Sequence, residues 1–326
     1  MYSLYRIGIE VEFMLKPLAV QFSASEKLRT IVDRIISACN PQLRASAQLR
    51  NRVDKSCSRP EHWSLKKDNS VIAYEWNAVP LELVSPILDY NETNAWRDDL
   101  RDIFRALSTA CDIEVNTTCG VHVHISRAMA PWKLQTLKEL CRNIFYFEDV
   151  INTLVPEHRL DNEMIESSRR GSEPLQGKPP CECVRIVNKC VSTPHLVRVM
   201  NNYGSRYFAW NLTNMTSGNR KTVEFRQPPG ANTAEPVLQW AEFVVLFLHA
   251  AMRSVSFEQL SQIPRSLSGL FYFLSIHMPL GYDTRAVEDL LSASFKSKQL
   301  QLAARAEEAE KAREAEEEAE AELISS

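Results

Sequence analysis

The sequence predicts an α+β fold in which helices pack on one face of a curved, mainly antiparallel sheet. Short β-prone runs of alternating apolar and polar residues recur at 9–13, 81–83, 121–125 and 222–226. Longer segments with helical periodicity separate these runs, at 25–39, 93–109, 131–154 and 235–254. A chain of 326 residues with 44% hydrophobic residues can also bury a substantial core. We therefore expect a sheet with one apolar face and one polar face.

Individual elements follow from the same patterns. The predicted strands are 4–14, 71–76, 79–84, 113–115, 120–126, 207–211 and 221–226. Pro131 suits the first position of the helix over 131–154, because proline lacks the amide hydrogen that this position does not need. A short helix is expected over 195–201, and Gly-Asn at 218–219 indicates a turn before the last strand.

The chain divides into a main domain over 1–295 and a tail over 296–326. Within the main domain, 155–190 is predicted to be a loop or lid insertion, because Pro, Gly, Ser and charged residues dominate 167–180. The segment 303–323 is almost entirely Ala, Glu, Arg and Lys, which favours a solvated helix. This segment lacks the large apolar residues of a coiled coil, and we expect no catalytic role for it.

Composition narrows the possible partners. The chain carries 38 basic and 41 acidic residues, a net charge of −3 that gives no basic excess for nucleic acid. The longest apolar run, 243–252, is too short to span a bilayer. Residues 1–13 do not resemble a signal peptide, so we expect a cytoplasmic protein with reduced thiols. Cys181, Cys183 and Cys190 lack a matched second pair, which favours structural thiols over a zinc site.

The polar positions of the alternating runs are rich in residues used in active sites. These positions hold Glu10, Glu12, Glu82, His122, His124, Glu224 and Arg226. Glutamates that alternate with apolar residues often face solvent, so the first pair alone is weak support for a site. Two histidines on one strand face shift the balance toward a functional site, because H-x-H is a ligand geometry. If the strands share one sheet, its polar face collects four carboxylates, two imidazoles and a guanidinium.

A folded protein tolerates such a cluster of carboxylates only if some are protonated, if they are widely exposed, or if cations lie between them. Two carboxylates about 6 Å apart repel by roughly 3 kcal/mol at an effective dielectric constant near 20. Oxygen-rich ligation suits Mg²⁺ or Mn²⁺, and an imidazole favours Mn²⁺. Arg226 beside Glu224 adds an anion contact, and metals together with a fixed guanidinium are typical of phosphoryl transfer. The chain contains no Gly-rich phosphate loop, so metals and side chains would hold the nucleotide.

The order of the motifs resembles that of the amidoligase family. The segments are GIEVEF from Gly8, WSLKKDNS from Trp63, LELVSP from Leu81, CGVHVHIS from Cys119, SRYFAWNL from Ser205 and TVEFRQPPG from Thr222. The resemblance covers about 6–252. It implies a glutamine synthetase-like catalytic fold, because this family is related to glutamine synthetase and γ-glutamylcysteine ligase. It also implies an ATP-dependent carboxylate–amine ligase, which forms an amide or isopeptide bond through an acyl phosphate.

The resemblance also implies residue roles. The implied metal ligands are Glu10, Glu12, Glu82, His122 and Glu224, with Glu224 sharing a metal with His122. His124 resembles a contact to the nucleotide phosphates, and Arg206 a contact to a carboxylate or phosphate. Arg226 resembles the arginine that stabilises the transferring phosphoryl group. Asp68 and Asn211 match family positions, and we place them with the substrate. The implied substrates are a small-molecule or peptide carboxylate and an amine.

Two alternatives use the same residues. A metal-dependent phosphohydrolase would use the same carboxylates, with water as the nucleophile in place of an amine. A catalytically degenerate ligase fold would serve as an interaction module, with the charged tail as its contact surface. Release of phosphate without an amine would favour the first alternative, and failure to bind Mg·ATP would favour the second.

Overall fold

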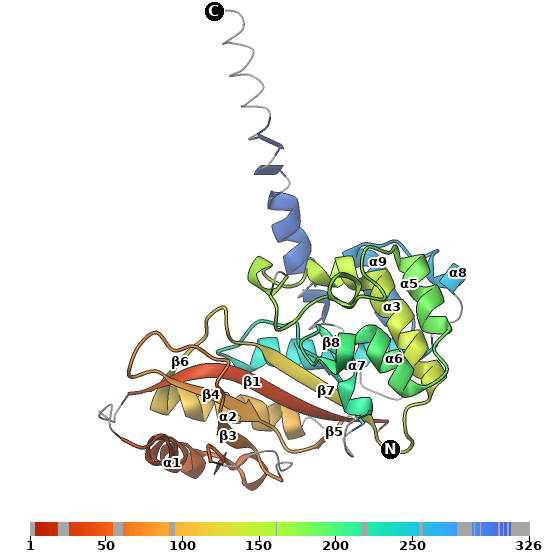
Figure 1. The fold of residues 1–326 in the computed structure, drawn as a ribbon. Coiled ribbons are helices and arrows are strands. Elements are labelled where there is room, and N and C mark those ends of the chain that lie inside the picture. Colours follow the sequence, from red (N-terminus) through yellow and green to blue (C-terminus); the bar gives the residue numbers. More distant parts are fainter. Residues whose placement is uncertain are drawn as a thin grey trace, which may run out of the picture.

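A long first strand, β1 (Tyr5–Pro17), runs through the middle of the sheet and pairs on both sides. The computed structural model describes residues 4–18, 26–54, 61–90, 95–160, 162–216, 221–253, 257–278, 289, 291–293, 295–305, 307–308, 310–311 and 313. The first half of β1 pairs with β5 (Leu88–Tyr90) and β7 (Val121–Arg127). The second half pairs with β4 (Val79–Val84) and β6 (Cys111–Glu114). The N-terminal strand is therefore the scaffold on which the other strands align (Figure 1).

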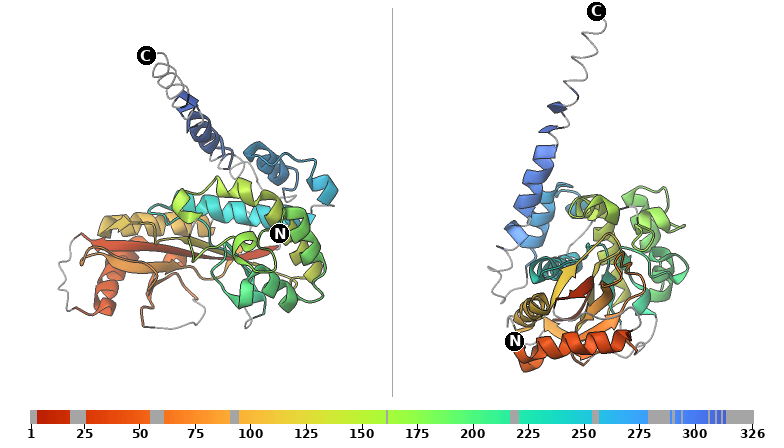
Figure 2. Two further views of the ribbon diagram at one scale, coloured as in Figure 1. Left: turned by 45° about the horizontal axis from the view of Figure 1, so that its top comes forward. Right: turned by 90° about the vertical axis from the view of Figure 1, so that its left-hand side faces the viewer.

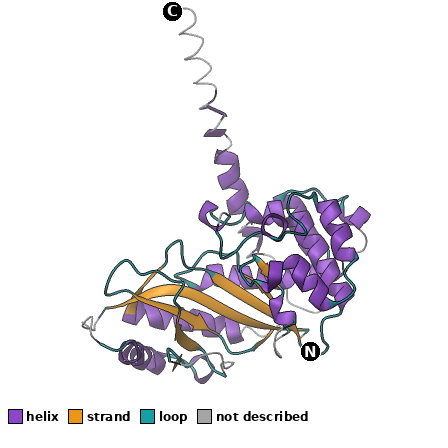
Figure 3. Cartoon of the chain, viewed as in Figure 1, coloured by secondary structure: helices purple, strands orange, loops and turns teal. Residues whose placement is uncertain are grey.

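The remaining strands extend the sheet on both sides. Its order is β2-β3-β4-β1-β7-β9-β8, where β2 is Arg50–Asn51, β3 is Ser64–Lys67, β8 is Trp210–Asn211 and β9 is Val223–Phe225. The pairing of β2 with β3 is parallel, and the other pairings are antiparallel. The expected mainly antiparallel sheet in a mixed α/β fold is thus confirmed (Figure 3).

Helices cover the apolar face of the sheet. Alternate residues of β1 point into this layer and are at most 1% exposed: Ile7, Ile9, Val11, Phe13 and Leu15. α2 (Ala95–Ala110) and α7 (Ala234–Arg253) lie against this face, and α1 (Leu28–Cys39) packs on α2 (Figure 2). Burial of these alternate residues forces Glu10 and Glu12 to the opposite face.

A second group of helices packs around α3. α3 (Leu134–Asn152) contacts α7, α5 (Pro180–Asn188), α6 (Thr193–Met200) and α9 (Leu267–Ser275). The other short helical elements are η1 (Asn40–Gln42), η2 (Ala45–Ala47), η3 (Glu157–Arg159), α4 (Ser168–Gly171), η4 (Asn202–Gly204), η5 (Thr213–Met215) and α8 (Phe257–Leu260). Within the described ranges, every helix is too short or too polar to traverse a lipid bilayer.

The structure corrects three expectations about local elements. Residues 71–76 are not a strand, and the strand lies upstream at β3, where Leu65 is fully buried. α3 begins at Leu134, so Pro131 precedes the helix. The segment 155–190, expected to be a loop or lid, contains the short helices η3 and α4 and the helix α5, which packs on α3. The turn expected at 218–219 lies outside the described residues.

The tail is helical where the structure describes it. Residues 295–305 are helical and project from the domain (Figure 1). Phe295 is 5% exposed and lies 6.0 Å from Phe271, measured between ring centroids. The helix therefore begins in contact with the core, and its continuation beyond Arg313 lies outside the described residues.

A buried histidine makes the stability of the fold dependent on pH. The hydroxyl of Tyr5 on β1 lies 2.9 Å from Nδ1 of His249 on α7, and both residues are 3% exposed. Burial, with the nearby charges of Arg253 and His277, lowers the pKa of His249 to about 4 from 6.5. The unfolded chain therefore takes up a proton before the folded protein does as the pH falls.

The free energy of unfolding should fall by about 3 kcal/mol as the pH is lowered from 6.5 to 4 because of His249, since one pKa unit corresponds to about 1.4 kcal/mol. The wild type and His249→Gln should be compared by urea unfolding across this range. The substitution should flatten the pH dependence of the unfolding free energy. Equal slopes for the two proteins would contradict this assignment.

Candidate active site

Strand register gathers the acidic side chains of β1 with those of its neighbours. Glu12 lies opposite Glu82 of β4, and Glu82 lies opposite Lys66 of β3. On the other side of β1, Glu10 lies opposite His122 of β7. Residues in register on one face of a sheet have neighbouring side chains. Four strands therefore bring these charged groups together on the face opposite the helices.

The row continues onto the last two strands. His124 of β7 lies opposite Glu224 of β9, and Glu224 lies opposite Asn211 of β8. Glu224 is 3% exposed and Asn211 is 2% exposed. The four predicted strand motifs thus share one sheet, and their polar residues lie on one face, as the alternation indicated.

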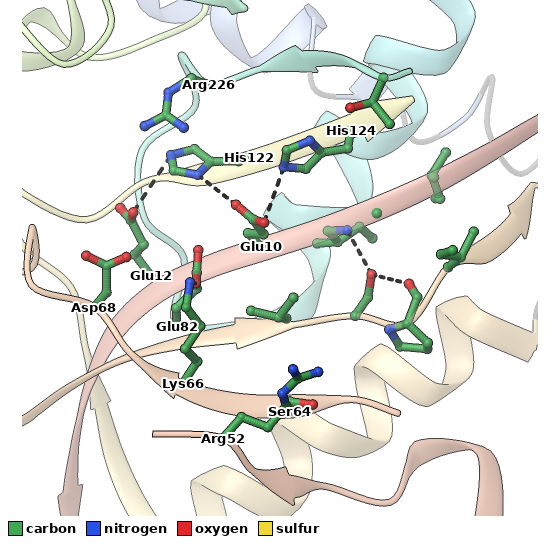
Figure 4. Close-up of a pocket in the computed structure, with 18 of the residues that line it drawn as sticks. Glu10, Glu12, Arg52, Ser64, Lys66, Asp68, Glu82, His122, His124 and Arg226 are labelled. Carbon is green, nitrogen blue, oxygen red and sulfur yellow. Dashed lines mark hydrogen bonds and ion pairs between the residues drawn. The ribbon is translucent and has the colours of Figure 1, made fainter. Parts of the chain in front are cut away.

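Charged residues of β1, β3, β4 and β7 line a cavity of about 280 Å³ (Figure 4). It is lined by Arg6, Ile7, Gly8, Ile9, Glu10, Glu12, Arg52, Ser64, Lys66, Asp68, Ser70, Glu82, Val84, Ser85, Pro86, Ile87, His122, His124, Ser126, Met164, Arg206, Thr222 and Arg226. Its size is close to that of small-molecule sites in proteins. The carboxylates and imidazoles from β1, β4 and β7 point toward one another in this cavity (Figure 4).

Glu10 is at the centre of the cluster. Its Oε2 lies 3.4 Å from His122 Nδ1, and its Oε1 lies 3.3 Å from His124 Nε2. Burial opposes ionisation of Glu10, but the charge of His124 and contacts with both imidazoles hold its pKa well below the usual range. Glu10 is therefore an anion that contacts both histidines of the H-x-H pair.

Glu82 has the opposite electrostatic environment. Burial, followed by the charge of Glu10, raises the pKa of Glu82 well above its usual range. Lys66 Nζ lies 2.9 Å from Glu82 Oε2 and partly opposes this shift. The crowding of carboxylates that the sequence implied is thus present between these two strands, and a cation would relieve it.

Glu12 is held by the backbone. The amide of Gly120 donates to Glu12 Oε2 at 2.7 Å, and His122 Nε2 lies 3.8 Å from Oε1. Burial raises the pKa of Glu12, although the charge of His122 acts against the shift. The charge of Arg226 also acts against the shift, but burial outweighs these effects, so the carboxylate is fixed in orientation and its ionised form is only partly compensated.

Glu224 connects three polar groups. It accepts from Asn211 Nδ2 at 2.7 Å and from Arg226 Nη1 at 2.5 Å, and its Oε1 lies 3.8 Å from His124 Nε2. Burial opposes its ionisation, but the charges of His124 and Arg226 lower its pKa. Burial lowers the pKa of His124, yet Glu224 and Glu10 raise it to about 9. The pair is therefore ionised near neutral pH.

Three overlapping groups of side chains have ligand atoms close enough to share a metal ion. They are Glu10–Glu82–His122, Glu10–His124–Glu224 and Glu12–Asp68–Glu82, each with its ligand atoms within 4.8 Å of one another. Carboxylate oxygens with one imidazole are a donor set that suits Mg²⁺ or Mn²⁺. The donor chemistry therefore fits the metals that the sequence implied.

The groups differ in detail from the expected ligand set. All five expected ligands belong to them, and His124 and Asp68 are additional members. Glu224 is grouped with His124, whereas we expected it to share a metal with His122. Strand register explains the difference, because Glu224 lies directly opposite His124.

The other expected site residues occupy different positions. Arg226 lines the cavity, whereas Asn211 and its partner Glu224 are buried and are not among its lining residues. The Asn211 side chain donates to Glu224, and its expected substrate contact stays a prediction. Arg206 also lines the cavity but is exposed, with its guanidinium 5.4 Å from the ring centroid of Tyr207. It is available to a ligand that enters the cavity.

Sequence reasoning missed two charged residues. Lys66 faces the cavity beside Glu82, and alternation within SLKK would have indicated this if 64–67 had been assigned as the strand. Arg159 is 3% exposed and hydrogen-bonds to the loops behind the cluster. Burial lowers its pKa to about 10, so it remains charged at neutral pH. No sequence pattern marked Arg159.

Comparisons with known proteins agree with the motif order. A family model described as "Putative amidoligase enzyme" matches residues 4–248. No curated protein matches the sequence. The structure is similar to Plasmodium falciparum glutamine synthetase, with 12% identity, a TM-score of 0.46 and coverage of 93% of this chain and 73% of that one. It is also similar to the Pup ligase PafA, solved in complex with prokaryotic ubiquitin-like protein Pup, with 11% identity, a TM-score of 0.41 and coverage of 91% and 64%.

Proposed function

This chain belongs to the amidoligase family, and on this premise we propose that it is an ATP- and Mg²⁺-dependent carboxylate–amine ligase. The observation that supports the proposal most strongly is the set of three linked groups of possible metal ligands, two with an imidazole and one of carboxylates alone, with Arg226 beside them. Such a site combines places for cations with a fixed guanidinium. This combination suits transfer of a phosphoryl group to a carboxylate.

Divalent metal would be held by the three groups, in which the Glu10–Glu82–His122 group shares Glu10 with the second and Glu82 with the third. Bound Mg²⁺ or Mn²⁺ would neutralise the β- and γ-phosphates of ATP and so reduce the repulsion that an attacking carboxylate meets. Arg226 is held by Glu224 at 2.5 Å, which fixes its guanidinium at the wall of the cavity. From there it stabilises the charge that develops on the phosphoryl oxygens. Arg206 provides a second contact for a carboxylate or phosphate.

The proposed reaction has two steps. A carboxylate oxygen of the acid attacks the γ-phosphorus, the bond from that phosphorus to the bridging oxygen breaks, and ADP leaves. The amine nitrogen then attacks the acyl carbon, the carbon–oxygen bond to phosphate breaks, and the nitrogen loses a proton to solvent. The products are an amide or isopeptide, ADP and inorganic phosphate. The cavity positions the reactants, which supplies much of the rate enhancement in such transfers.

Release of ADP should require both an added carboxylate and an added amine. A panel of small-molecule and peptide acids and amines should be screened by coupled ADP assay with Mg²⁺, and the product identified by mass spectrometry. We expect a new mass equal to acid plus amine minus water. Phosphate release without an amine and without an amide product would support a phosphohydrolase instead. Failure to bind Mg·ATP would support an interaction module.

A further inference from the structure

Arg159 lies outside every recognisable motif but reaches the back of the active site. It ends η3, the short turn that follows α3, and its side chain is almost completely buried. Its guanidinium donates to three main-chain carbonyl oxygens: Nε to Gln227 at 3.1 Å, Nη2 to Arg226 at 2.9 Å and Nη1 to Cys119 at 3.4 Å. One side chain thus joins its own turn to two segments that are far away in the sequence, at Cys119 and at 226–227.

The three carbonyls belong to two loops that carry site residues. Cys119 precedes Gly120, whose amide holds the Glu12 carboxylate. The carbonyls of Arg226 and Gln227 lie directly after β9, where Arg226 extends into the cavity. The two loops are also bonded to each other, because Gly230 N donates to the Cys119 carbonyl at 2.9 Å. Arg159 therefore contacts the supports of Glu12 and Arg226 together.

Gly120 shows how closely this arrangement is packed. A methyl group added at its Cα would lie 2.8 Å from Arg159 Nη2 and 3.3 Å from both Glu12 Oε2 and His122 Nε2. A buried guanidinium, a carboxylate and an imidazole therefore converge on the space that a glycine leaves open. After burial, Glu12 is the largest influence on the charge of Arg159. Among the neighbouring charged groups, Arg159 therefore interacts most strongly with the carboxylate of Glu12.

We infer that Arg159 is a positioning residue that holds Glu12 for cation binding and fixes Arg226 relative to it. The inference rests on the proposed function, because it assumes that the Glu12 group binds a divalent cation. A guanidinium can hydrogen-bond to three carbonyls at once and remain charged. Lysine keeps the charge but lacks the planar array of donors, and a methionine side chain has no charge and no donors. A residue needed only for folding would change the melting temperature and leave cation affinity unchanged.

Mn²⁺ alone is the probe that separates these roles. The full-length chain should be titrated with Mn²⁺ by calorimetry, without nucleotide or substrates, well below its melting temperature. We expect Arg159→Met to weaken binding at one class of sites at least ten-fold and Arg159→Lys to have a smaller effect. Arg169→Lys is the matched control, because Arg169 lies in the same segment but pairs with Glu148 and Asp149. It should bind Mn²⁺ as the wild type does.

A double-mutant cycle tests the route of the effect. If Arg159 acts through Glu12, Arg159→Met should have little effect on Mn²⁺ affinity in a Glu12→Gln background. Additive losses in the double variant would overturn the inference, as would wild-type affinity in folded Arg159→Met. If Arg159→Met does not fold, the Mn²⁺ affinity of Arg159→Lys is the test. Wild-type affinity in that variant would overturn the inference. Wild-type protein that binds no Mn²⁺ would instead refute the proposed metal site itself.

Discussion

Glu224→Gln should abolish ADP release, with a loss of at least about 10³-fold, while the protein remains folded. Removing its charge takes one carboxylate from the group with Glu10 and His124 and leaves Arg226 without its ion partner. Both effects act on phosphoryl transfer, in which a correctly placed arginine alone contributes about 10³-fold or more. The measurement is the coupled ADP assay, with circular dichroism to confirm folding.

The fold should survive because glutamine has nearly the same shape as glutamate. Charges from Glu12 and Glu10 also act on Arg226 and would keep it partly compensated. Glu235→Gln is the matched control, since Glu235 lies on α7 with a side chain that is 57% exposed. It should retain full turnover. Normal turnover in Glu224→Gln would remove the catalytic role that we assign to this residue.

Glu10→Gln should cause a comparable loss of activity for a different reason. Glu10 belongs to two of the three ligand groups, so one substitution removes a carboxylate from both. We expect Mn²⁺ binding to lose at least one class of sites and turnover to fall at least about 10³-fold. Calorimetric titration with Mn²⁺ and the ADP assay measure the two effects separately.

The same substitution should lower the melting temperature of the metal-free protein at neutral pH. The two imidazoles hold the pKa of Glu10 well below its usual range, so the Glu10 charge stabilises the folded state even though it also raises the pKa of Glu82. Glu114→Gln, at the end of β6 and outside the cavity, is the control for loss of one negative charge. A fully active Glu10→Gln variant would show that the two groups do not bind the essential metal.

Alternation was a reliable guide where one strand face is buried and the other is polar. Because side chains alternate strictly along a strand, Glu10, His122 and Glu224 could be assigned to one face from the sequence alone. The apolar positions between them are buried, as expected, with Val11, Val123 and Phe225 all fully buried. The fold class followed from these runs and from the helical periodicity between them.

The prediction for 71–76 failed because β propensity does not reveal tertiary partners. Ile72, Tyr74 and Trp76 are 51%, 77% and 70% exposed, so no layer covers the face that they would share. The neighbouring run SLKK has weaker β propensity but pairs with β4 over Ser64–Lys67. Packing and pairing decide strand position, and a single sequence does not contain the register.

The residues of the site were more predictable than their arrangement. The motifs supplied five expected ligands that the structure places in the three groups, but they could not indicate that Asp68 would join Glu12 and Glu82. That grouping depends on how the loop after β3 turns toward the sheet. Arg159 was beyond prediction, because an isolated arginine in an irregular segment acquires its role only when distant loops meet around it.

The central place of β1 has a consequence for biosynthesis. This strand is synthesised before its neighbours β4 and β7, which follow only with residues 79–84 and 121–127, and Glu224 comes about a hundred residues later still. High contact order of this kind slows folding and leaves apolar strand edges uncovered during synthesis. An incompletely synthesised chain therefore lacks the assembled form of the proposed cation site. Tight binding of Mn²⁺ by a protein sample would then indicate that the complete sheet has formed.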